Sequence, residues 1–404
     1  MRRILFSMLF LMTACISFAQ VKSVKEAKRL AEDSSKPDFA RAEALINEAF
    51  VNPETKDDPN TWNVAGIIQR RISEKENEKA YLRQPYDTVK VYNSVYKMFE
   101  YFLKADELEQ IPDEKGKVKF KYRKNNAATM LTERPNLING GITYFNQDKN
   151  KEAFKFFSMY VDVARSPMLV KENLMATDTL LSQIAYYATL AAMREEDYKS
   201  AVKYAPLAAK DKEVGKYGVE FLATAYKALG DTVQWVSTLK EGIQQYPDYS
   251  FFFGHLVDYY SNTGKFDEAM VFADGMIAQD PNNPFYLYVK GYLYQNMKDY
   301  DNASQFYKKT IEVDPTYAEA YSNLGLIYVQ QGLDYADKVT TDFNDPRYNE
   351  EQAKVRAFYE EARPYYEKAR QLKPDQKDLW LNGLYTIYYR LNMGPEFEEI
   401  EKLM

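Results

Sequence analysis

The sequence of 404 residues is poor in the side chains that build cross-links and metal sites, with one cysteine, one histidine and three tryptophans. The single cysteine, Cys15, leaves no partner for a disulfide within the chain, so stability must come from packing alone. The single histidine, His255, has no second histidine or thiol with which to share a zinc ion. We therefore interpret His255 as a structural residue on a helix and expect neither a metal nor another cofactor.

A basic excess and long apolar runs are missing as well. Lys and Arg number 53 against 59 Asp and Glu, which gives a net charge of −6. Because nucleic-acid binding needs a basic face, this balance argues against nucleic acid as a partner. After the first twenty residues, no segment has the ~18 consecutive apolar residues of a transmembrane helix, so we expect none.

Catalytic signatures are also missing. The sequence contains no G-x-S-x-G, G-x-x-x-x-G-K-S/T, H-E-x-x-H or calcium-loop motif. Acidic pairs such as Glu195-Glu196 could supply general acids, but in helical segments such pairs are typical of solvated faces. We therefore expect that the protein is not an enzyme. The alternative is an enzyme hidden in the irregular segments 72–133 or 333–361.

The first nineteen residues have the layout of a signal peptide. Two arginines precede an apolar run from Ile4 to Ala14, and Ser17-Phe18-Ala19 has the small residues of a cleavage site. We expect residues 1–19 to be removed and the protein to be exported to the periplasm or the periplasmic face of the outer membrane. The alternative is that Met12-Thr13-Ala14-Cys15 acts as a lipoprotein signal and leaves a lipid anchor on Cys15.

An internal period of 34 residues runs through the second half of the sequence. It aligns four tyrosines, three prolines and pairs of alanine and glycine: Tyr226, Tyr260, Tyr294, Tyr328; Pro247, Pro281, Pro315; Ala269, Ala303; Gly291, Gly325. Within 284–317, small and apolar residues recur at helical spacing on both sides of a break at Lys298-Asp299, and Asp314-Pro315 ends the second run. The spacing predicts a helical hairpin whose remaining apolar side must be buried against the next copy.

The units resemble the tetratricopeptide repeat (TPR). They place a bulky residue at place 4, a small one at 8, Tyr at 11, Ala at 20, an aromatic at 24 and Pro at 32. Units of full length start at Lys216, Ser250, Pro284 and Ala318, and more divergent ones start near residues 59, 134 and 182. The resemblance implies an all-α, right-handed α-solenoid of about nine helical hairpins, some of them with inserts.

Departures from the repeat divide the chain into expected regions. After the signal peptide, residues 20–133 form a degenerate TPR-like helical region, and residues 134–332 form the regular array. In the unit that starts at Ala318, the alanine of place 20 falls at Ala362 instead of residue 337. This insert predicts that residues 333–404 form a lengthened hairpin followed by capping helices.

A basic segment with the sequence KGKVKFKYRK interrupts the acidic chain at residues 115–124. Its charges alternate with apolar and aromatic side chains, a period of two that indicates an extended conformation. Lys117, Lys119, Lys121 and Arg123 are therefore candidates for a loop that contacts an acidic partner or lipid head groups. The alternative is an inter-helix connection whose apolar side lies on the solenoid.

The resemblance also implies that the first helix of each hairpin lines a concave groove through places 2, 5, 9 and 12. The candidate partner-binding residues at these places are Phe251, Phe285, Tyr288, Tyr292, Tyr217, Asp258 and Gln295. We expect the first four, all aromatic, to form one partly exposed patch, which is a feature typical of binding sites. In these units, places 5 and 9 do not carry the lysine and asparagine with which some TPR proteins bind a terminal carboxylate.

A groove that exists before binding loses little entropy when an extended peptide or a helix enters it. The resemblance therefore implies a non-catalytic scaffold or assembly factor of the bacterial cell envelope, with envelope proteins as partners. The alternative is a glycan-binding outer-membrane component, in which the aromatic rings would stack on sugars.

Overall fold

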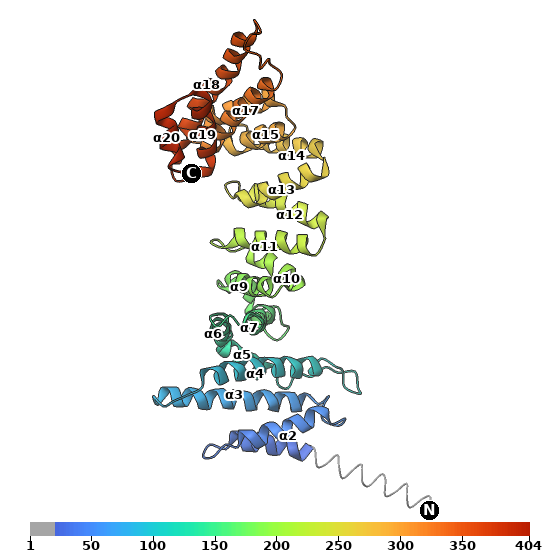
Figure 1. The fold of residues 1–404 in the computed structure, drawn as a ribbon. Coiled ribbons are helices and arrows are strands. Elements are labelled where there is room, and N and C mark those ends of the chain that lie inside the picture. Colours follow the sequence, from blue (N-terminus) through green and yellow to red (C-terminus); the bar gives the residue numbers. More distant parts are fainter. Residues whose placement is uncertain (1–20) are drawn as a thin grey trace, which may run out of the picture. The chain divides into compact units, whose positions relative to one another are not determined.

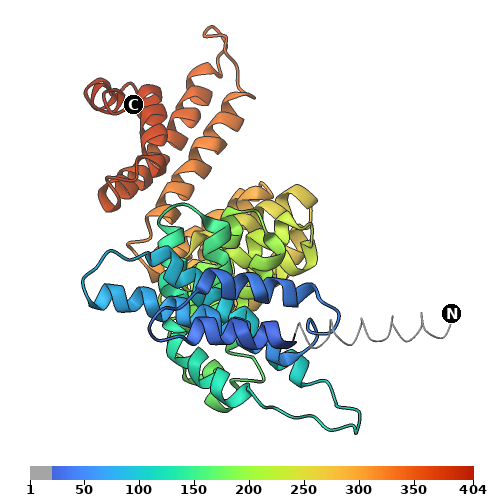
Figure 2. The same ribbon diagram turned by 90° about the horizontal axis from the view of Figure 1, so that it is seen from below.

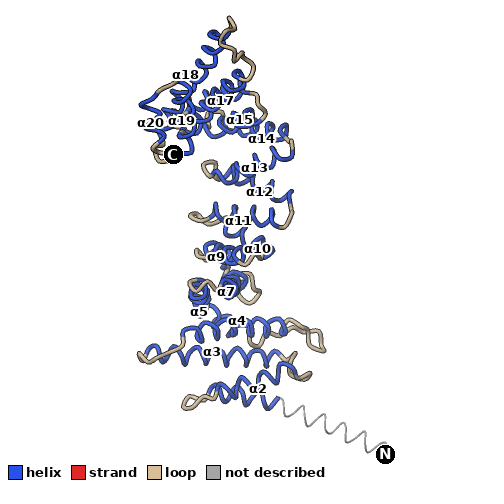
Figure 3. Tube along the Cα trace, in the orientation of Figure 1, coloured by secondary structure: helices blue, strands red, loops and turns tan. Residues whose placement is uncertain are grey.

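The computed structural model describes residues 21–404. The predicted signal peptide and Cys15 lie outside the described residues. Over residues 21–404 every regular element is a helix, and Figure 3 shows helices joined by loops throughout this range. The predicted all-α fold is confirmed. The described helices follow one another as nine consecutive hairpins, with α5 and the short α8 standing outside the pairs.

The described residues divide into two compact units, 21–238 and 239–404, and helix α12 (Thr232–Gln245) contains the boundary. The regions 20–133, 134–332 and 333–404 follow the regularity of the repeat and not compactness, so they stay a prediction.

The first unit begins with a helix at residues 21–32. It continues with α2 (Phe39–Val51), α3 (Pro59–Tyr81), α4 (Thr88–Glu109), α5 (Arg123–Glu133), α6 (Pro135–Phe145), α7 (Asn150–Val163), the 3-10 turn η1 (Val170–Glu172), α8 (Leu174–Thr177), α9 (Leu181–Arg194), α10 (Tyr198–Ala208) and α11 (Gly215–Ala228). Helices pack in sequential pairs, α3 on α4, α6 on α7 and α9 on α10 (Figure 1). Neighbouring pairs stack through α7 on α9 and α10 on α11, which is the stacking that the sequence predicts.

The second unit contains α13 (Ser250–Thr263), α14 (Phe266–Gln279), α15 (Pro284–Asn296), α16 (Tyr300–Val313), α17 (Ala318–Ala336), α18 (Tyr348–Leu372), the 3-10 turn η2 (Lys377–Leu379), α19 (Leu381–Leu391) and α20 (Gly394–Glu401). The pairs are α13 with α14, α15 with α16, α17 with α18 and α19 with α20, and each pair packs on the next. First helices of the hairpins therefore have odd numbers in this unit, and second helices have even numbers.

The repeat turns set where helices begin. Before α15, the side chain of Asn283 accepts a hydrogen bond of 3.0 Å from the backbone N–H of Phe285, and Pro284 occupies the first turn, where its missing N–H costs nothing. Before α16, Asp299 accepts a hydrogen bond of 3.2 Å from the backbone N–H of Asn302. These caps satisfy donors that the helix itself leaves unpaired. The polar residues of these two turns thus fix where α15 and α16 begin.

Within the hairpins, a glycine on the first helix faces an aromatic ring on the second. A Cβ added at Gly141 would lie 2.3 Å from the ring of Phe157, one at Gly291 would lie 2.9 Å from Tyr307, and one at Gly325 would lie 2.6 Å from Tyr366. Distances this short mean that no side chain larger than hydrogen fits unless the ring moves. The small residue at place 8 and the aromatic residue at place 24 are therefore one packing unit, and together they hold the two helices close.

Replacing Gly325 by alanine should destabilise the second unit, because the new methyl group would overlap the buried ring of Tyr366. We expect a loss of about 1–3 kcal/mol in the free energy of unfolding, measured by urea denaturation followed by circular dichroism. Gly275→Ala is the matched control: Gly275 lies on α14 with nothing within 4 Å of its Cβ position. That variant should gain about 0.5–1 kcal/mol from helix propensity. Equal stability of the two variants would contradict the packing argument.

The insert in residues 333–361 lengthens both helices of its hairpin, as the sequence predicts. Helix α17 has 19 residues and α18 has 25, against 13 and 14 in the preceding pair. Their connection, with the turn sequence Phe343–Asn349, forms the tip of the hairpin, which projects beyond α19 and α20 in both Figure 1 and Figure 2. The base of the hairpin keeps the regular packing, since Gly325 still contacts Tyr366.

A buried carboxylate joins the ends of the long α3–α4 hairpin. The side chain of Glu76 is 5% exposed and accepts hydrogen bonds from Lys79 Nζ (2.9 Å), from Lys90 Nζ (3.2 Å) and from the backbone N–H of Asp87 (3.2 Å). Burial raises the pKa of Glu76, but the hydrogen bonds from Lys79, Asp87 and Lys90 outweigh it and lower the pKa from 4.5 to about 2. The ionised carboxylate is thus the form that stabilises the fold.

Because its pKa is lower in the folded state, Glu76 stabilises the first unit above about pH 4.5, and this contribution is lost as the pH falls towards 2. We expect Glu76→Gln to unfold more easily than wild type at pH 7, by about 1–3 kcal/mol. The difference should shrink steadily between pH 4.5 and 2 in urea titrations. Glu78→Gln, at an exposed position of the same helix, should change stability little. A difference that is independent of pH would refute the assignment.

Candidate functional site

A pocket of about 430 Å³ lies at the turn end of the first helices of the second unit. Its walls come from the start of α13, from the N-terminal half of α15 and from the turn between α16 and α17, with the end of α18 at one edge. The lining residues are Pro247, Asp248, Ser250, Phe253, Phe285, Tyr288, Asp314, Thr316, Tyr317, Glu319 and Lys373. Because consecutive hairpins contribute equivalent positions, the repeat itself builds this hollow.

Aromatic rings form one wall of the pocket. The ring of Phe253 on α13 lies 5.6 Å from that of Phe285 and 5.8 Å from that of Tyr292, both on α15. The ring of Tyr288 lies 5.1 Å from that of Tyr317, at 34° between their planes. Offset and edge-on contacts at these distances are favourable beyond the burial of area. The wall is therefore a connected set of rings from two helices and one turn.

Hydrogen bonds hold the aromatic rings of this wall in place. Tyr307 donates to Gln295 Oε1 at 2.6 Å, and Asn323 Nδ2 donates to the hydroxyls of Tyr288 (3.0 Å) and Tyr307 (3.3 Å). Burial raises the pKa of the Tyr288, Tyr307 and Tyr317 hydroxyls above the ordinary range, so all three stay neutral. Among residues 21–404 the hydroxyl of Tyr317 has no hydrogen-bond partner, so it is available to a bound group.

Carboxylates edge the pocket. Asp314 accepts hydrogen bonds from the backbone N–H (2.8 Å) and the hydroxyl (2.7 Å) of Thr316, which fixes its position in the turn. Glu319 pairs with Lys373 at 3.3 Å. Asp248 is exposed, and neither it nor Asp314 has an ion-pair partner within the described part of the chain. A pocket with aromatic walls and two uncompensated carboxylates is suited to a cation on an apolar stem.

The structure brings together part of the predicted groove set. Phe285 and Tyr288 line the pocket described above, and Tyr292 and Gln295 line a neighbouring pocket of about 280 Å³ at the other end of α15. Phe285 is only 9% exposed, so it supports the wall more than it presents a free face. All four predicted residues that line a pocket lie on α15, so the site centres on this helix.

The other predicted residues lie elsewhere. Phe251 does not join the aromatic wall; its ring contacts Tyr249 at 6.2 Å and His255 at 4.5 Å, because its neighbour Phe253 is the residue that faces α15. Asp258 is exposed on α13 and lines neither pocket. Tyr217 lies on α11 of the first unit, where its ring is 6.5 Å from that of Tyr186. The expected single patch is thus smaller, and Phe253 takes the place of Phe251.

Three pocket residues could have been found from the turns of the repeat. The sequences Pro247-Asp248-Tyr249 and Pro315-Thr316-Tyr317 occupy the same places of two units that are two repeats apart, just before a first helix. The first provides Asp248 and the second provides Thr316 and Tyr317 to the pocket. A prediction from helix faces alone does not include these turn residues. Phe253 was missed because place 4 was assigned to the core.

The basic segment forms a non-helical connection between α4 and α5. Lys117, Lys119 and Lys121 are exposed, and Val118 and Phe120 are each 44% exposed, so the apolar side of the segment is not covered. Arg123 differs from the lysines: its guanidinium makes two hydrogen bonds to Asp106, at 2.5 and 2.8 Å, and stacks on the ring of Phe120. Arg123 therefore anchors the segment and is not a free contact residue.

Removing this anchor should loosen the connection. In Arg123→Ala, the carboxylate of Asp106, which is 4% exposed, would lose its partner. We expect faster amide hydrogen exchange in residues 111–122, measured by mass spectrometry on the intact chain. Lys124→Ala is the control, since Lys124 is exposed and makes no ion pair among the described residues. Unchanged exchange in the Arg123 variant would show that other contacts hold the segment.

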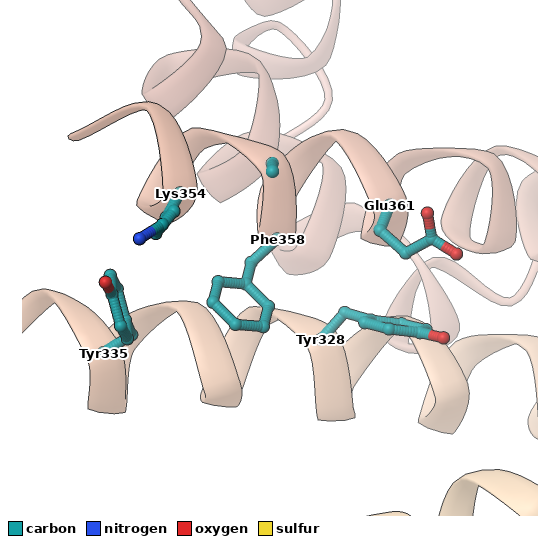
Figure 4. Close-up of a pocket in the computed structure, with 6 residues that line it drawn as sticks. Tyr328, Tyr335, Lys354, Phe358 and Glu361 are labelled. Atoms are coloured by element: carbon teal, nitrogen blue, oxygen red, sulfur yellow. The ribbon is translucent and has the colours of Figure 1, made fainter. Parts of the chain in front are cut away.

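The lengthened hairpin carries a separate apolar hollow of about 340 Å³, shown in Figure 4. Tyr328 and Tyr335 on α17 and Phe358 on α18 line it, with Lys354 and Glu361 at its edges. The ring of Tyr335 lies 6.0 Å from that of Phe358. Lys354 is already paired with Glu350 at 2.7 Å. The hollow therefore combines apolar surface with one carboxylate, Glu361, that makes no ion pair within the described residues.

Metal and membrane features were sought over residues 21–404. In this range no three His, Cys, Asp or Glu side chains are grouped closely enough to hold a metal ion. The helices of the same range include none that combines the length and the apolar character needed to cross a membrane. His255 lies half-buried on α13, where its ring packs edge-on against that of Phe251.

The paired, stacked helices define an α-helical repeat protein. A family model of the TPR repeat matches residues 291–332, which span the end of α15, α16 and most of α17. The chain thus carries tetratricopeptide repeats, and the expected family is confirmed over this segment. Proteins built from these repeats generally act as scaffolds for protein–protein interaction, and the fold is typically non-catalytic.

Solved structures with similar helices include other repeat proteins. A TPR repeats protein from Bacteroides fragilis is 20% identical, with 67% of this chain and 99% of that chain covered and a TM-score of 0.33. The C-terminal part of a TPR repeat-containing protein from Cytophaga hutchinsonii is 17% identical, with 65% and 92% covered and a TM-score of 0.36. MamA from Desulfovibrio magneticus is 13% identical, with 48% and 96% covered and a TM-score of 0.29.

The comparison with curated proteins found no match.

Proposed function

We propose that this protein is a non-catalytic scaffold of the bacterial cell envelope that binds a segment of a partner protein across α13, α15 and α17. The pocket of about 430 Å³ would receive a lysine or arginine side chain of that segment. The observation that supports this proposal is the combination of aromatic walls with the unpaired carboxylates of Asp248 and Asp314. The signal-like sequence of residues 1–19 supports the envelope as the location.

Several interactions would contribute to the binding of the cation. A cation held against Phe253, Tyr288 or Tyr317 gains roughly 0.5–2 kcal/mol from the ring faces, more where water is excluded. Asp248 and Asp314 add Coulomb attraction, and the methylene stem of the side chain can pack on the rings. Because the rings are already held by Asn323 and by each other, little ordering is needed on binding. The chain's net charge of −6 favours a basic partner segment over long distances.

The adjacent pocket gives this segment a direction. Tyr292 and Gln295 are displaced along α15 from Phe285 and Tyr288, and they line the second pocket with Leu326 and Gln330 of α17. Leu326 is 41% exposed, so its apolar side chain is open to a bound segment. An extended segment that places its cation in the first pocket can therefore place an apolar or amide side chain in the second.

The test uses residues 21–404 and an array of peptides whose central residue is Lys, Arg, norleucine or Glu. Norleucine keeps most of the apolar stem of lysine and removes its charge. We expect Lys- or Arg-centred peptides to bind at least tenfold more tightly than their norleucine and Glu counterparts. Asp248→Lys should lose this tenfold preference, equal to about 1.4 kcal/mol, because it brings a positive charge to the rim. Affinities would be measured by fluorescence anisotropy.

Glu312→Lys is the control for net charge, since Glu312 is exposed on α16 and lines neither pocket. It should bind like wild type. Both variants change exposed residues, so a failure to fold is not expected, and circular dichroism would verify it. Equal binding of Lys and norleucine peptides would refute the cation pocket. Binding of soluble glycans that is insensitive to Asp248→Lys would favour the glycan-binding alternative, which stays a prediction.

A further inference from the structure

A second pocket, of about 380 Å³, lies wholly in the first unit. It is enclosed by the helix of residues 21–32, by α3, by the end of the basic segment and by the first turns of α5. The lining residues are Lys28, Asn63, Ile67, Arg70, Phe102, Lys121, Tyr122, Asn125, Asn126 and Thr129. The same pocket therefore joins groups that are far apart in the sequence.

The lining of this pocket is basic. Lys28, Arg70 and Lys121 contribute three positive charges, and no carboxylate lines it. Two of these cations already have acidic neighbours. Glu74 is shared between Arg70 (3.2 Å) and Arg71 (2.6 Å), and Glu32 lies 3.8 Å from Lys28.

Lys121 is the least compensated of the three cations. The nearby Glu109 accepts hydrogen bonds from the backbone N–H groups of Lys121 (2.6 Å) and Tyr122 (3.0 Å), so it is engaged with the main chain. The ammonium of Lys121 makes no ion pair within 4 Å in the described part of the chain and lies 5.0 Å from the ring of Tyr122. In a chain with an acidic balance overall, this is a local positive potential inside a concave surface, where charges attract an anion most strongly.

A buried donor without a partner points to the same ligand. Asn126 is 5% exposed, and its Nδ2 finds no hydrogen-bond acceptor among the described residues. A buried amide left in this state costs about 1–3 kcal/mol. Asn63, which is 6% exposed, lies in the same lining, and the hydroxyl of Thr129 is a further polar group there. An oxygen atom bound in the pocket would satisfy the amide of Asn126.

We propose that this pocket binds an oxyanion, a phosphate or a carboxylate, carried by a small organic molecule or a lipid head group. Lys28, Arg70 and Lys121 would neutralise the charge, and Asn126 would donate to an oxygen. The volume corresponds to roughly twelve waters, more than a bare phosphate fills, so part of the ligand lies against Ile67 and Tyr122. This site is independent of the proposed peptide pocket, whose residues all belong to the second unit.

The basic segment gains a role from this placement. Lys121 is the lysine of the segment that reaches the pocket, whereas Lys117, Lys119 and Lys124 do not line it. Arg123 and Asp106 hold the end of the segment on α4, which positions Lys121 against α3 and α5. The structural expectation thus applies to Arg123, and the contact role of Lys121 is part of this proposal.

The test is isothermal titration of residues 21–404, at 150 mM NaCl, with inorganic phosphate, with citrate and with vesicles containing phosphatidylglycerol. We expect saturable binding of at least one probe to wild type. The Lys28→Gln, Lys121→Gln double variant should weaken that binding at least tenfold, and Asn126→Ala should weaken it as well. Lys75→Gln, Lys104→Gln is the control, because it removes the same charge from exposed positions of α3 and α4 outside the pocket.

The arms of the experiment identify the source of the anion. Binding of phosphate or citrate in solution indicates a small ligand, and binding of the vesicles alone indicates a lipid head group; both support the oxyanion. The absence of binding to every probe would overturn the proposal, as would equal weakening in the control variant. Both lysines of the double variant are on the surface, so circular dichroism should show an unchanged fold. If this proposal is wrong, the proposed peptide pocket of the second unit is not affected.

Discussion

The close contact between a glycine and an aromatic ring, present in the hairpins α3–α4, α6–α7, α15–α16 and α17–α18, is the constraint on which the rest of the structure depends. It fixes the distance between first and second helices, and therefore the shape of the surface that each hairpin presents to the next. Tyr366 shows how far this goes: Cβ atoms added at Gly325 and at Gly383 would both overlap its ring, so one side chain spaces its own hairpin and the one that follows. The pockets form as a consequence of this spacing between the helices.

Most of the fold could be predicted because its determinants are local and repeated. The 34-residue period, the turn prolines and the small residue at place 8 each act within one hairpin, so they are visible without any long-range contact. The lengthening of α17 and α18 followed from the displaced Ala362. The extra helix α5 was not foreseen, since it lies between a long hairpin and a regular one and belongs to no repeat.

The candidate sites were harder to predict because they combine residues from different hairpins and from turns. A helix-face rule found Phe285 and Tyr288 but chose Phe251 over Phe253, two positions that differ by about half a turn of α13. The turn residues Asp248 and Tyr317 have no place in such a rule. The basic pocket was harder still to predict, because Lys28, Arg70 and Lys121 meet only through the packing of three helices and one connection.

The lengthened α17–α18 hairpin shows where a repeat array can accept new sequence. Residues added at the tip of a hairpin extend both helices away from the stack, and the contacts at the base, such as Gly325 with Tyr366, keep their register. The length of one hairpin can thus vary without changing the packing of the hairpins on either side. An array of this kind can gain new surface in one hairpin while the remaining hairpins fold as before.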